Sequence, residues 1–166
     1  MRLSVKIKLS PEEKRQIGVP TAPRPEIDIV AYDVKENKLY LIEVKSYLDS
    51  PGVRYNDVVT IQKKQSGRFK ILTCSNYQKV IEKRLLEDWR IVGQIPLNIK
   101  FRYGLVAGKI HSKKKNTNAE EDLVEYFAKK DWLFWGPKAI KERMKKLVEK
   151  GYENNEATIV SKILLK

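Results

Sequence analysis

The sequence predicts an α/β fold, with a mixed central β-sheet flanked by helices and a helical appendage at the C-terminus. Three observations predict it. Strand-like segments gather early in the chain, segments with apolar residues at helical spacing lie between and after them, and 166 residues suffice for one domain with a small extension. We therefore expect a core over residues 1–130 and a helical extension over residues 131–166 packed on it. A helix-turn-helix-like module is the alternative for the extension.

The first half of the chain predicts three strands and a short helix. Apolar and polar residues alternate over 3–9, which is typical of a half-buried strand. A serine followed by a proline then starts a helix of about two turns over 10–18. Two apolar runs, 27–32 and 39–45, flank a polar turn and predict a β-hairpin. The second run is apolar on both faces, which indicates a central strand.

The second half of the chain mixes strand-like and helical patterns. Residues 53–65 are ambiguous between helix and loop. The other expected elements are a third buried strand at 69–74, a helix capped by Asn76 over 77–92, a strand at 99–108, a helix at 118–130, a helix from Gly136-Pro137 to about residue 150, and a final helix or strand at 157–165.

Charged residues interrupt the predicted hairpin where apolar ones are expected. Charges are rarely buried unless they are paired or bind a metal. Counting outward from a turn centred near Glu36 sets Asp28 opposite Glu43, Val44 or Lys45. Glu43 and Lys45 share one face of their strand. If Asp28 points to that face, two carboxylates and an ammonium lie within about 5–8 Å of one another. The alternative is a surface hairpin with a cross-strand Asp–Lys pair.

A cluster of two carboxylates and an ammonium suits phosphodiester hydrolysis, and the residues that form it have the spacing of a known family motif. Residues 25–28, Pro-Glu-Ile-Asp, followed by Glu43-Val44-Lys45 at a strand end, resemble the PD-(D/E)xK nuclease superfamily, which has the restriction-endonuclease-like fold. The resemblance covers about residues 25–47. It implies that Asp28 and Glu43 bind Mg²⁺, with Mn²⁺ as a substitute, and that Val44 lends its backbone carbonyl to the metal. It implies that Lys45 assists the attacking water.

The chain departs from the family before the first catalytic strand. The family usually has a full helix there, often with another acidic residue, and the short helix over 10–18 leaves less room. Glu12 or Glu13 could supply that auxiliary carboxylate, although we favour the simpler role of complementing the helix dipole. Gln62 is a further auxiliary candidate, because some members place a glutamine on the helix after the ExK motif.

Positive charge is concentrated directly after the candidate site. The net charge is +13, of which residues 51–115 hold +11, while residues 1–50 and 116–166 hold +1 each. A basic segment of this kind favours a polyanion partner over a lysine-rich surface kept for solubility. The expected nucleic-acid contacts are Lys63, Lys64, Arg68, Lys70, Lys113, Lys114 and Lys115.

Other features bound the compartment and the partners. The single cysteine, Cys74, excludes an intramolecular disulfide and suits a reducing compartment. No apolar run is long enough to span a membrane, and the alternating N-terminus is unlike a signal peptide. We therefore expect a cytoplasmic protein without a membrane partner. The only histidine, His111, lacks a His or Cys partner for zinc, so phosphate contact is the better expectation.

These observations favour a metal-dependent nuclease that hydrolyses phosphodiester bonds of DNA as an endonuclease. A homodimer would allow both strands to be cut. The alternative is a catalytically inactive nucleic-acid-binding protein on a nuclease-like fold. A protein-interaction subunit whose basic face meets an acidic protein is a third, weaker hypothesis.

Overall fold

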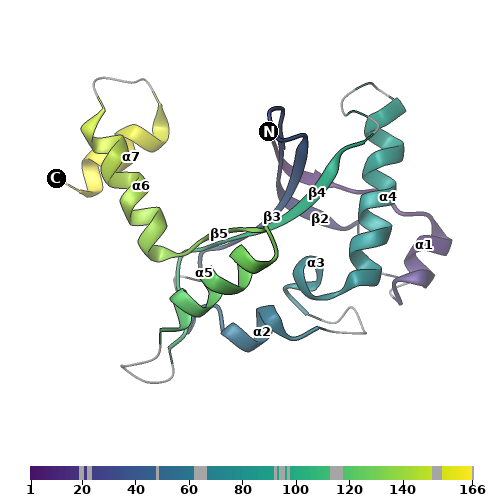
Figure 1. Ribbon diagram of the computed structural model, residues 1–166, viewed down its shortest axis with the longest axis horizontal. Coiled ribbons are helices and arrows are strands. Elements are labelled where there is room, and N and C mark those ends of the chain that lie inside the picture. The colour runs from purple at the N-terminus through teal and green to yellow at the C-terminus, as the bar shows by residue number, and fades with distance from the viewer. Residues whose placement is uncertain are drawn as a thin grey trace.

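A five-stranded mixed sheet forms the centre of the molecule (Figure 1). The structure, a computed structural model, describes residues 1–18, 21, 24–47, 49–61, 67–91, 93, 96, 98–112, 118–150 and 155–165. Strand order follows the sequence, and the first three strands pair antiparallel while the last three pair parallel. The strands are β1 (Arg2–Lys6), β2 (Glu26–Asp33), β3 (Lys38–Lys45), β4 (Lys100–Ala107) and β5 (Leu133–Trp135).

Helices flank the sheet, which confirms the predicted α/β class. They are α1 (Pro11–Gln16), α2 (Tyr55–Val59), α3 (Lys70–Thr73), α4 (Ser75–Ile91), α5 (Ala119–Lys129), α6 (Pro137–Glu149) and α7 (Glu156–Leu164). Figure 1 shows α1 and α4 at one end of the molecule and α6 with α7 at the other. No helix within the described ranges is long and apolar enough to cross a membrane.

One hydrophobic core joins β3, β4, α4 and α5. Leu39 and Leu41 of β3 are fully buried against Leu105 of β4, and Ile81 and Leu123 close the core from the helices. Each such side chain contributes about 1.5–3 kcal/mol by leaving water. Since strand residues alternate between two faces, the face that carries both leucines of β3 ends in Glu43 and Lys45. The core and the candidate site therefore share one face of one strand.

The predicted hairpin is confirmed, and its register lies within the expected range. β2 pairs with β3 from Asp33↔Lys38 at the turn to Ile29↔Ile42. Asn37 takes the positive φ of +50° that closes the turn, a conformation that asparagine tolerates well. The register follows from this local turn, so it fixes which residues meet at the far end of the hairpin.

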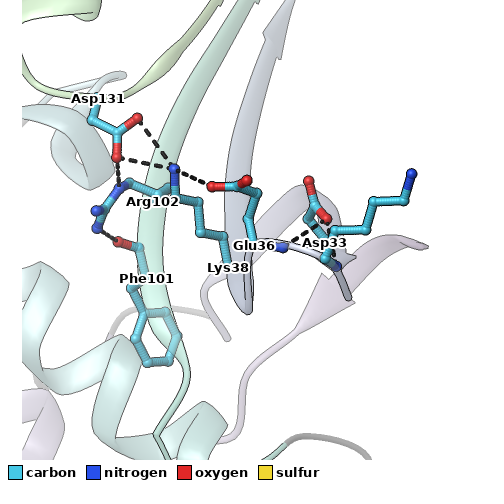
Figure 2. A network of polar contacts seen from close by, with 7 residues as sticks. Asp33, Glu36, Lys38, Phe101, Arg102 and Asp131 are labelled. Carbon is cyan, nitrogen blue, oxygen red and sulfur yellow. Dashed lines mark hydrogen bonds and ion pairs between the residues drawn. The ribbon is translucent and has the colours of Figure 1, made fainter.

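An ion-pair network holds the turn end of the hairpin in place (Figure 2). The Lys38 ammonium lies 3.2 Å from Asp131 and 3.4 Å from Glu36. Arg102 of β4 donates to the same Asp131 carboxylate at 2.6 Å, and the hydrogen bonds from Arg102 and Lys38 lower the pKa of Asp131. The network joins the hairpin, β4 and the turn after α5, and so supports the sheet that carries the site.

The predicted buried strand over 69–74 is wrong, because this segment forms α3. Phe69, Ile71, Leu72 and Cys74 are all buried, as the prediction required. A short continuous apolar run is compatible with either a strand or a buried helical turn, so its pattern cannot decide. The helical turn is closed by backbone hydrogen bonds to the Phe69 carbonyl, which also accepts from the Thr73 hydroxyl at 3.0 Å.

Two smaller differences concern helix α4 and strand β5. Helix α4 begins at Ser75, so Asn76 does not cap it and instead donates to the Gln16 carbonyl at 2.8 Å. Strand β5 lies inside the region expected to be a helical extension, and it pairs with β4 from Gly104↔Leu133 to Val106↔Trp135. The sheet therefore takes in three residues beyond the expected limit of the core.

The C-terminal helices pack mainly on each other. Helix α6 follows β5 directly and buries none of its side chains, while α7 buries Thr158 and Ser161. The ambiguous segment over 157–165 is a helix, and the Asn155 side chain caps it by accepting from the Ala157 and Thr158 backbone N–H groups. In Figure 1 this helical pair stands away from the middle of the sheet.

Candidate active site

The candidate site lies where β2 and β3 stop pairing. The last backbone pair is Ile29↔Ile42, and one further step sets Asp28 opposite Glu43. At this point the Val44 N–H donates to the Asp28 carboxylate at 2.7 Å. The Asp28 side chain thus accepts the hydrogen bond that a backbone carbonyl of β2 would accept in a continued ladder. The structure therefore brings Asp28 to the register position that the sequence predicts, beside Glu43 and Val44.

The Val44 carbonyl points to the same side of β3 as Asp28. The Gly108 N–H donates to the Lys45 carbonyl at 2.8 Å, so the peptide groups of Lys45 face β4. In a strand, the N–H and C=O of one residue point toward the same neighbouring strand, and those of the next residue point toward the opposite one. The Val44 N–H and carbonyl are therefore both directed toward β2 and Asp28.

Glu43 and Lys45 form an ion pair at the edge of the core. Their side chains are 14% and 20% exposed, and the Lys45 ammonium donates to Glu43 Oε1. Burial raises the pKa of Glu43, and the negative charge of Asp28 adds to this effect. The hydrogen bond and charge of Lys45 oppose it, as does the charge of Lys70. The three groups predicted from the sequence are therefore close enough to influence one another, with Lys70 as a fourth.

Two carboxylate oxygens remain available for a cation. Oδ2 of Asp28 accepts from Val44, and Oε1 of Glu43 accepts from Lys45. Among the described residues, Asp28 Oδ1 and Glu43 Oε2 have no hydrogen-bond or ion-pair partner. Mg²⁺ is commonly held by one or two carboxylates while it keeps several waters. The two carboxylates fit that ion.

The same donor set does not fit a metal enclosed by protein ligands. The described part of the chain contains no group of three or more His, Cys, Asp or Glu side chains that could hold a metal. His111 lies at the end of a short bridge between Val53 and Ile110, where its backbone N–H donates to the Val53 carbonyl. Cys74 is buried and has no disulfide partner. A tetrahedral zinc centre would need more nitrogen or sulfur ligands than these.

A pocket of about 250 Å³ opens in front of the ion pair. Its walls carry acidic and basic groups: Glu26 and Glu43 on the one hand, and Lys45, Arg68 and Lys70 on the other. A phosphate group could enter between the basic side chains and reach the carboxylates. We refer to this space as the site pocket.

The basic wall depends on the helix that the sequence analysis missed. Lys70 is the first residue of α3, and its ammonium lies 5.0 Å from the centre of the Tyr77 ring. Arg68 lies just before that helix, with its guanidinium 5.8 Å from the centre of the Tyr47 ring. The structure thus places two of the seven predicted nucleic-acid contacts at the pocket. The other five, Lys63, Lys64, Lys113, Lys114 and Lys115, lie outside the described residues, as does Gln62.

Glu26 is a site residue that the sequence analysis did not select. It lines the site pocket, and the Ser4 hydroxyl donates to its carboxylate at 2.5 Å. The available signal was its position two residues before Asp28, since such residues share a strand face. Asp28 itself is not among the lining residues, so the pocket approaches the site from the side of Glu43.

The auxiliary candidates on α1 have other contacts. Glu13 forms a capping box with Ser10, and Arg84 of α4 donates to the same carboxylate at 2.7 Å. Burial opposes ionisation of Glu13, but Arg84 and the Ser10 N–H outweigh it and hold the pKa below its ordinary value. Glu12 is exposed in the first turn of α1. Neither carboxylate lines the site pocket.

No protein-family model, no curated protein and no solved structure matches this chain.

Proposed function

We propose that the protein is a Mg²⁺-dependent nuclease that hydrolyses phosphodiester bonds of DNA as an endonuclease. One observation carries the proposal. Two neighbouring carboxylates, Asp28 and Glu43, each keep an oxygen without a partner among the described residues, beside Lys45 and a pocket that has a basic wall. The resemblance of residues 25–47 to the PD-(D/E)xK nucleases supports the same assignment, as does the excess charge of +11 over residues 51–115.

Each residue has a role that follows from its position. Asp28 and Glu43 would hold the metal through their free oxygens, with the Val44 carbonyl as a third oxygen donor. A bound Mg²⁺ supplies a Lewis acid for the phosphoryl oxygen and lowers the pKa of a bound water. Lys45, held by Glu43, orients the attacking water and stabilises developing negative charge. Mn²⁺ is expected to substitute for Mg²⁺.

The basic wall positions the substrate. Arg68 and Lys70 line the site pocket together with Glu43, and such side chains bind phosphate oxygens through charge-assisted hydrogen bonds. They place the scissile phosphate between the metal ligands and Lys45. Cleavage of both strands of a duplex takes two active sites, so we propose a homodimer for that reaction.

Supercoiled plasmid nicking with added Mg²⁺, Mn²⁺ or EDTA tests the proposal. We expect nicking with either cation and none in EDTA. Lys45→Met and Glu43→Gln should each slow nicking by about 100-fold or more, because they remove the water-orienting ammonium and a metal ligand. Lys100→Met is the matched control, since Lys100 is exposed on β4 and does not line the pocket. If Lys45→Met cleaves the plasmid at the wild-type rate, the proposal is disproved. A labelled RNA strand tests the preference for DNA, and we expect it to be cleaved more slowly than DNA.

A nucleic-acid-binding protein without catalysis is the second candidate. Within the described residues, no three His, Cys, Asp or Glu side chains are grouped so that they could hold a metal, and this favours it. This function predicts DNA binding in EDTA that weakens steeply with salt, that is unaffected by Glu43→Gln, and that is accompanied by no nicking at any cation concentration.

A further inference from the structure

A second pocket adjoins the site pocket and shares a wall with it. It has a volume of about 350 Å³, and both pockets are lined by Gly67 and Arg68. Its other side chains include Tyr47, Arg54, Asp57 and Phe69. Arg68 therefore stands between the two spaces. A ligand that extends from the candidate active site past Arg68 would enter this second space, which we call the side pocket.

Tyr47 is held in a strained conformation at the side pocket. It follows β3 two residues after Lys45, and its φ is +47°. This left-handed region is an outlier for a bulky side chain that cannot hydrogen-bond locally. Backbone strain of this kind persists only where the surroundings enforce it, and it is concentrated at functional sites. The ring is partly buried against the hydrophobic core, and the Arg68 guanidinium lies 5.8 Å from its centre.

The side pocket also carries two charged side chains that have no ion-pair partner in the described part of the chain. Arg54 and Asp57 are exposed, and neither forms an ion pair or side-chain hydrogen bond with any residue in the described ranges. Together with the Tyr47 ring, they present a stacking surface, a guanidinium donor and a carboxylate acceptor within one space. These are the groups that bind the ring, the phosphate and the amino group of a nucleotide.

We propose that the side pocket binds a single unpaired nucleotide next to the scissile phosphate, with a base that carries an exocyclic amino group. This proposal rests on the proposed nuclease function and specifies its substrate. The base takes the place of the Arg68 guanidinium on the Tyr47 ring and stacks there, while Arg54 and Arg68 bind the adjoining phosphate. Asp57 accepts from the amino group of adenine, cytosine or guanine. Thymine has no such group.

The size of the side pocket favours an unpaired nucleotide. Pockets of about 300–1,000 Å³ hold one small molecule of drug size, and the side pocket lies at the lower end of that range at about 350 Å³. A single nucleotide is a molecule of this class, whereas a base pair within a duplex is larger and is held between its neighbours. We therefore expect the protein to prefer single-stranded or locally opened DNA over a closed duplex.

Binding measured without metal tests the side pocket separately from catalysis. We would measure fluorescence anisotropy of labelled eight-nucleotide strands of dC, dA or dT in EDTA, with a closed duplex and free dCMP as competitors. We expect dC and dA strands to bind more tightly than dT, and the duplex and free dCMP to compete poorly. Tyr47→Ala should weaken binding of the dC strand by roughly 5- to 150-fold, the range of one lost base–aromatic stack. Tyr47→Phe should retain the affinity.

Three further variants separate recognition from folding. Both Tyr47→Gly and Tyr47→Ala lose the packing of a partly buried ring on the core, but Tyr47→Gly should melt at a higher temperature than Tyr47→Ala, because glycine adopts positive φ without strain. The two variants should bind the dC strand equally weakly. A purely structural tyrosine would leave their affinity for the dC strand unchanged. Asp57→Asn should shrink the preference for dC over dT. Tyr40→Ala, on the opposite face of β3, is the matched control and should bind like the wild type.

Two sets of results would overturn the proposal. If dC and dT strands bind with equal affinity, and Asp57→Asn changes neither affinity, Asp57 does not contact the amino group of the base. Tighter binding of the closed duplex, or free dCMP that competes as well as the strand, would remove the subsite within a DNA strand. If Mg²⁺-dependent nicking persists while these results are found, only the side pocket is disproved. If strand binding follows the expectation and nicking is absent, only the nuclease function is disproved.

Discussion

Replacing Asp28 with Asn or with Ala separates the two contacts of this carboxylate. Oδ2 accepts from the Val44 N–H at 2.7 Å, and Oδ1 is free to bind a cation. Asparagine keeps an acceptor oxygen for Val44 but loses the charge, whereas alanine loses both. A difference in stability between the two variants therefore measures the contribution of the hydrogen bond with Val44. A loss of cleavage that both variants share measures the contribution of the negative charge.

The magnitudes follow from the exposure of Val44. A hydrogen bond to a charged group contributes about 1.5–3 kcal/mol. Water can replace it here because Val44 is 38% exposed, so Asp28→Ala should cost about 1.5 kcal/mol, at the lower end. For a chain of this size that is a fall of roughly 3–6 °C in melting temperature. Asp28→Asn should cost about 0.5 kcal/mol, or roughly 1–2 °C.

Thermal unfolding followed by circular dichroism in EDTA gives the stabilities, and Mg²⁺-dependent plasmid nicking gives the activities. Both variants should slow nicking by about 100-fold or more, since the metal contributes several kcal/mol of transition-state stabilisation. Asp33→Asn is the matched control, because Asp33 ends the same strand and caps the Lys35 and Glu36 N–H groups. Wild-type nicking by Asp28→Asn, or equal falls in melting temperature for both Asp28 variants, would refute this reasoning.

Two further predictions concern the surroundings of the site. Burial, with the charge of Asp28, raises the pKa of Glu43 in the folded state above its ordinary value of 4.5, so ionisation destabilises the fold as the pH rises through this range. In EDTA, Glu43→Gln should therefore melt at a higher temperature than the wild type near pH 7. The difference in melting temperature should shrink toward pH 4, and equal melting temperatures near pH 7 would contradict this prediction. Gly52 has a φ of +102°, and a Cβ there would lie 2.8 Å from the Lys109 carbonyl oxygen. Gly52→Ala should therefore lower the free energy of unfolding, measured in urea, by about 2 kcal/mol or more. Gly18→Ala is the control and should lower it by about 1 kcal/mol, because Gly18 also has a positive φ but has open space around it. Equal losses for the two variants would show that the clash at Gly52 does not matter.

The hairpin and its charged groups could be predicted because they depend on local sequence. The turn around Asn37 fixes the register, and the register brings Asp28 to Glu43 across only a few residues of chain. The alternation along β3 then sets Glu43 and Lys45 on the core face. A single continuous segment of sequence therefore contains the acidic half of the candidate site.

The rest of the site depends on contacts between distant segments, which periodicity does not report. The pairing of β3 with β4 joins residues about 60 positions apart in the chain, and the basic wall required the helical turn α3 rather than a strand. Arg68 and Lys70 were selected for their charge alone, so their place at the pocket was not predicted. Tyr47 could not have been found from its residue type, because tyrosine rarely adopts positive φ.

The backbone holds the two sides of the candidate metal site through different neighbouring strands. β3 pairs with β4 as far as Lys45↔Ala107, whereas β2 leaves β3 after Ile29↔Ile42 and stays paired with β1 on both sides of Asp28, through Leu3↔Ile29 and Val5↔Ile27. Local opening of a protein starts where backbone hydrogen bonds are fewest, and no backbone pair joins β2 to β3 at Asp28 and Glu43. A cation held by both carboxylates would therefore link the two strands where their backbone pairing has ended. In hydrogen-exchange terms, it would slow the opening of β2 from β3 at the Val44 N–H.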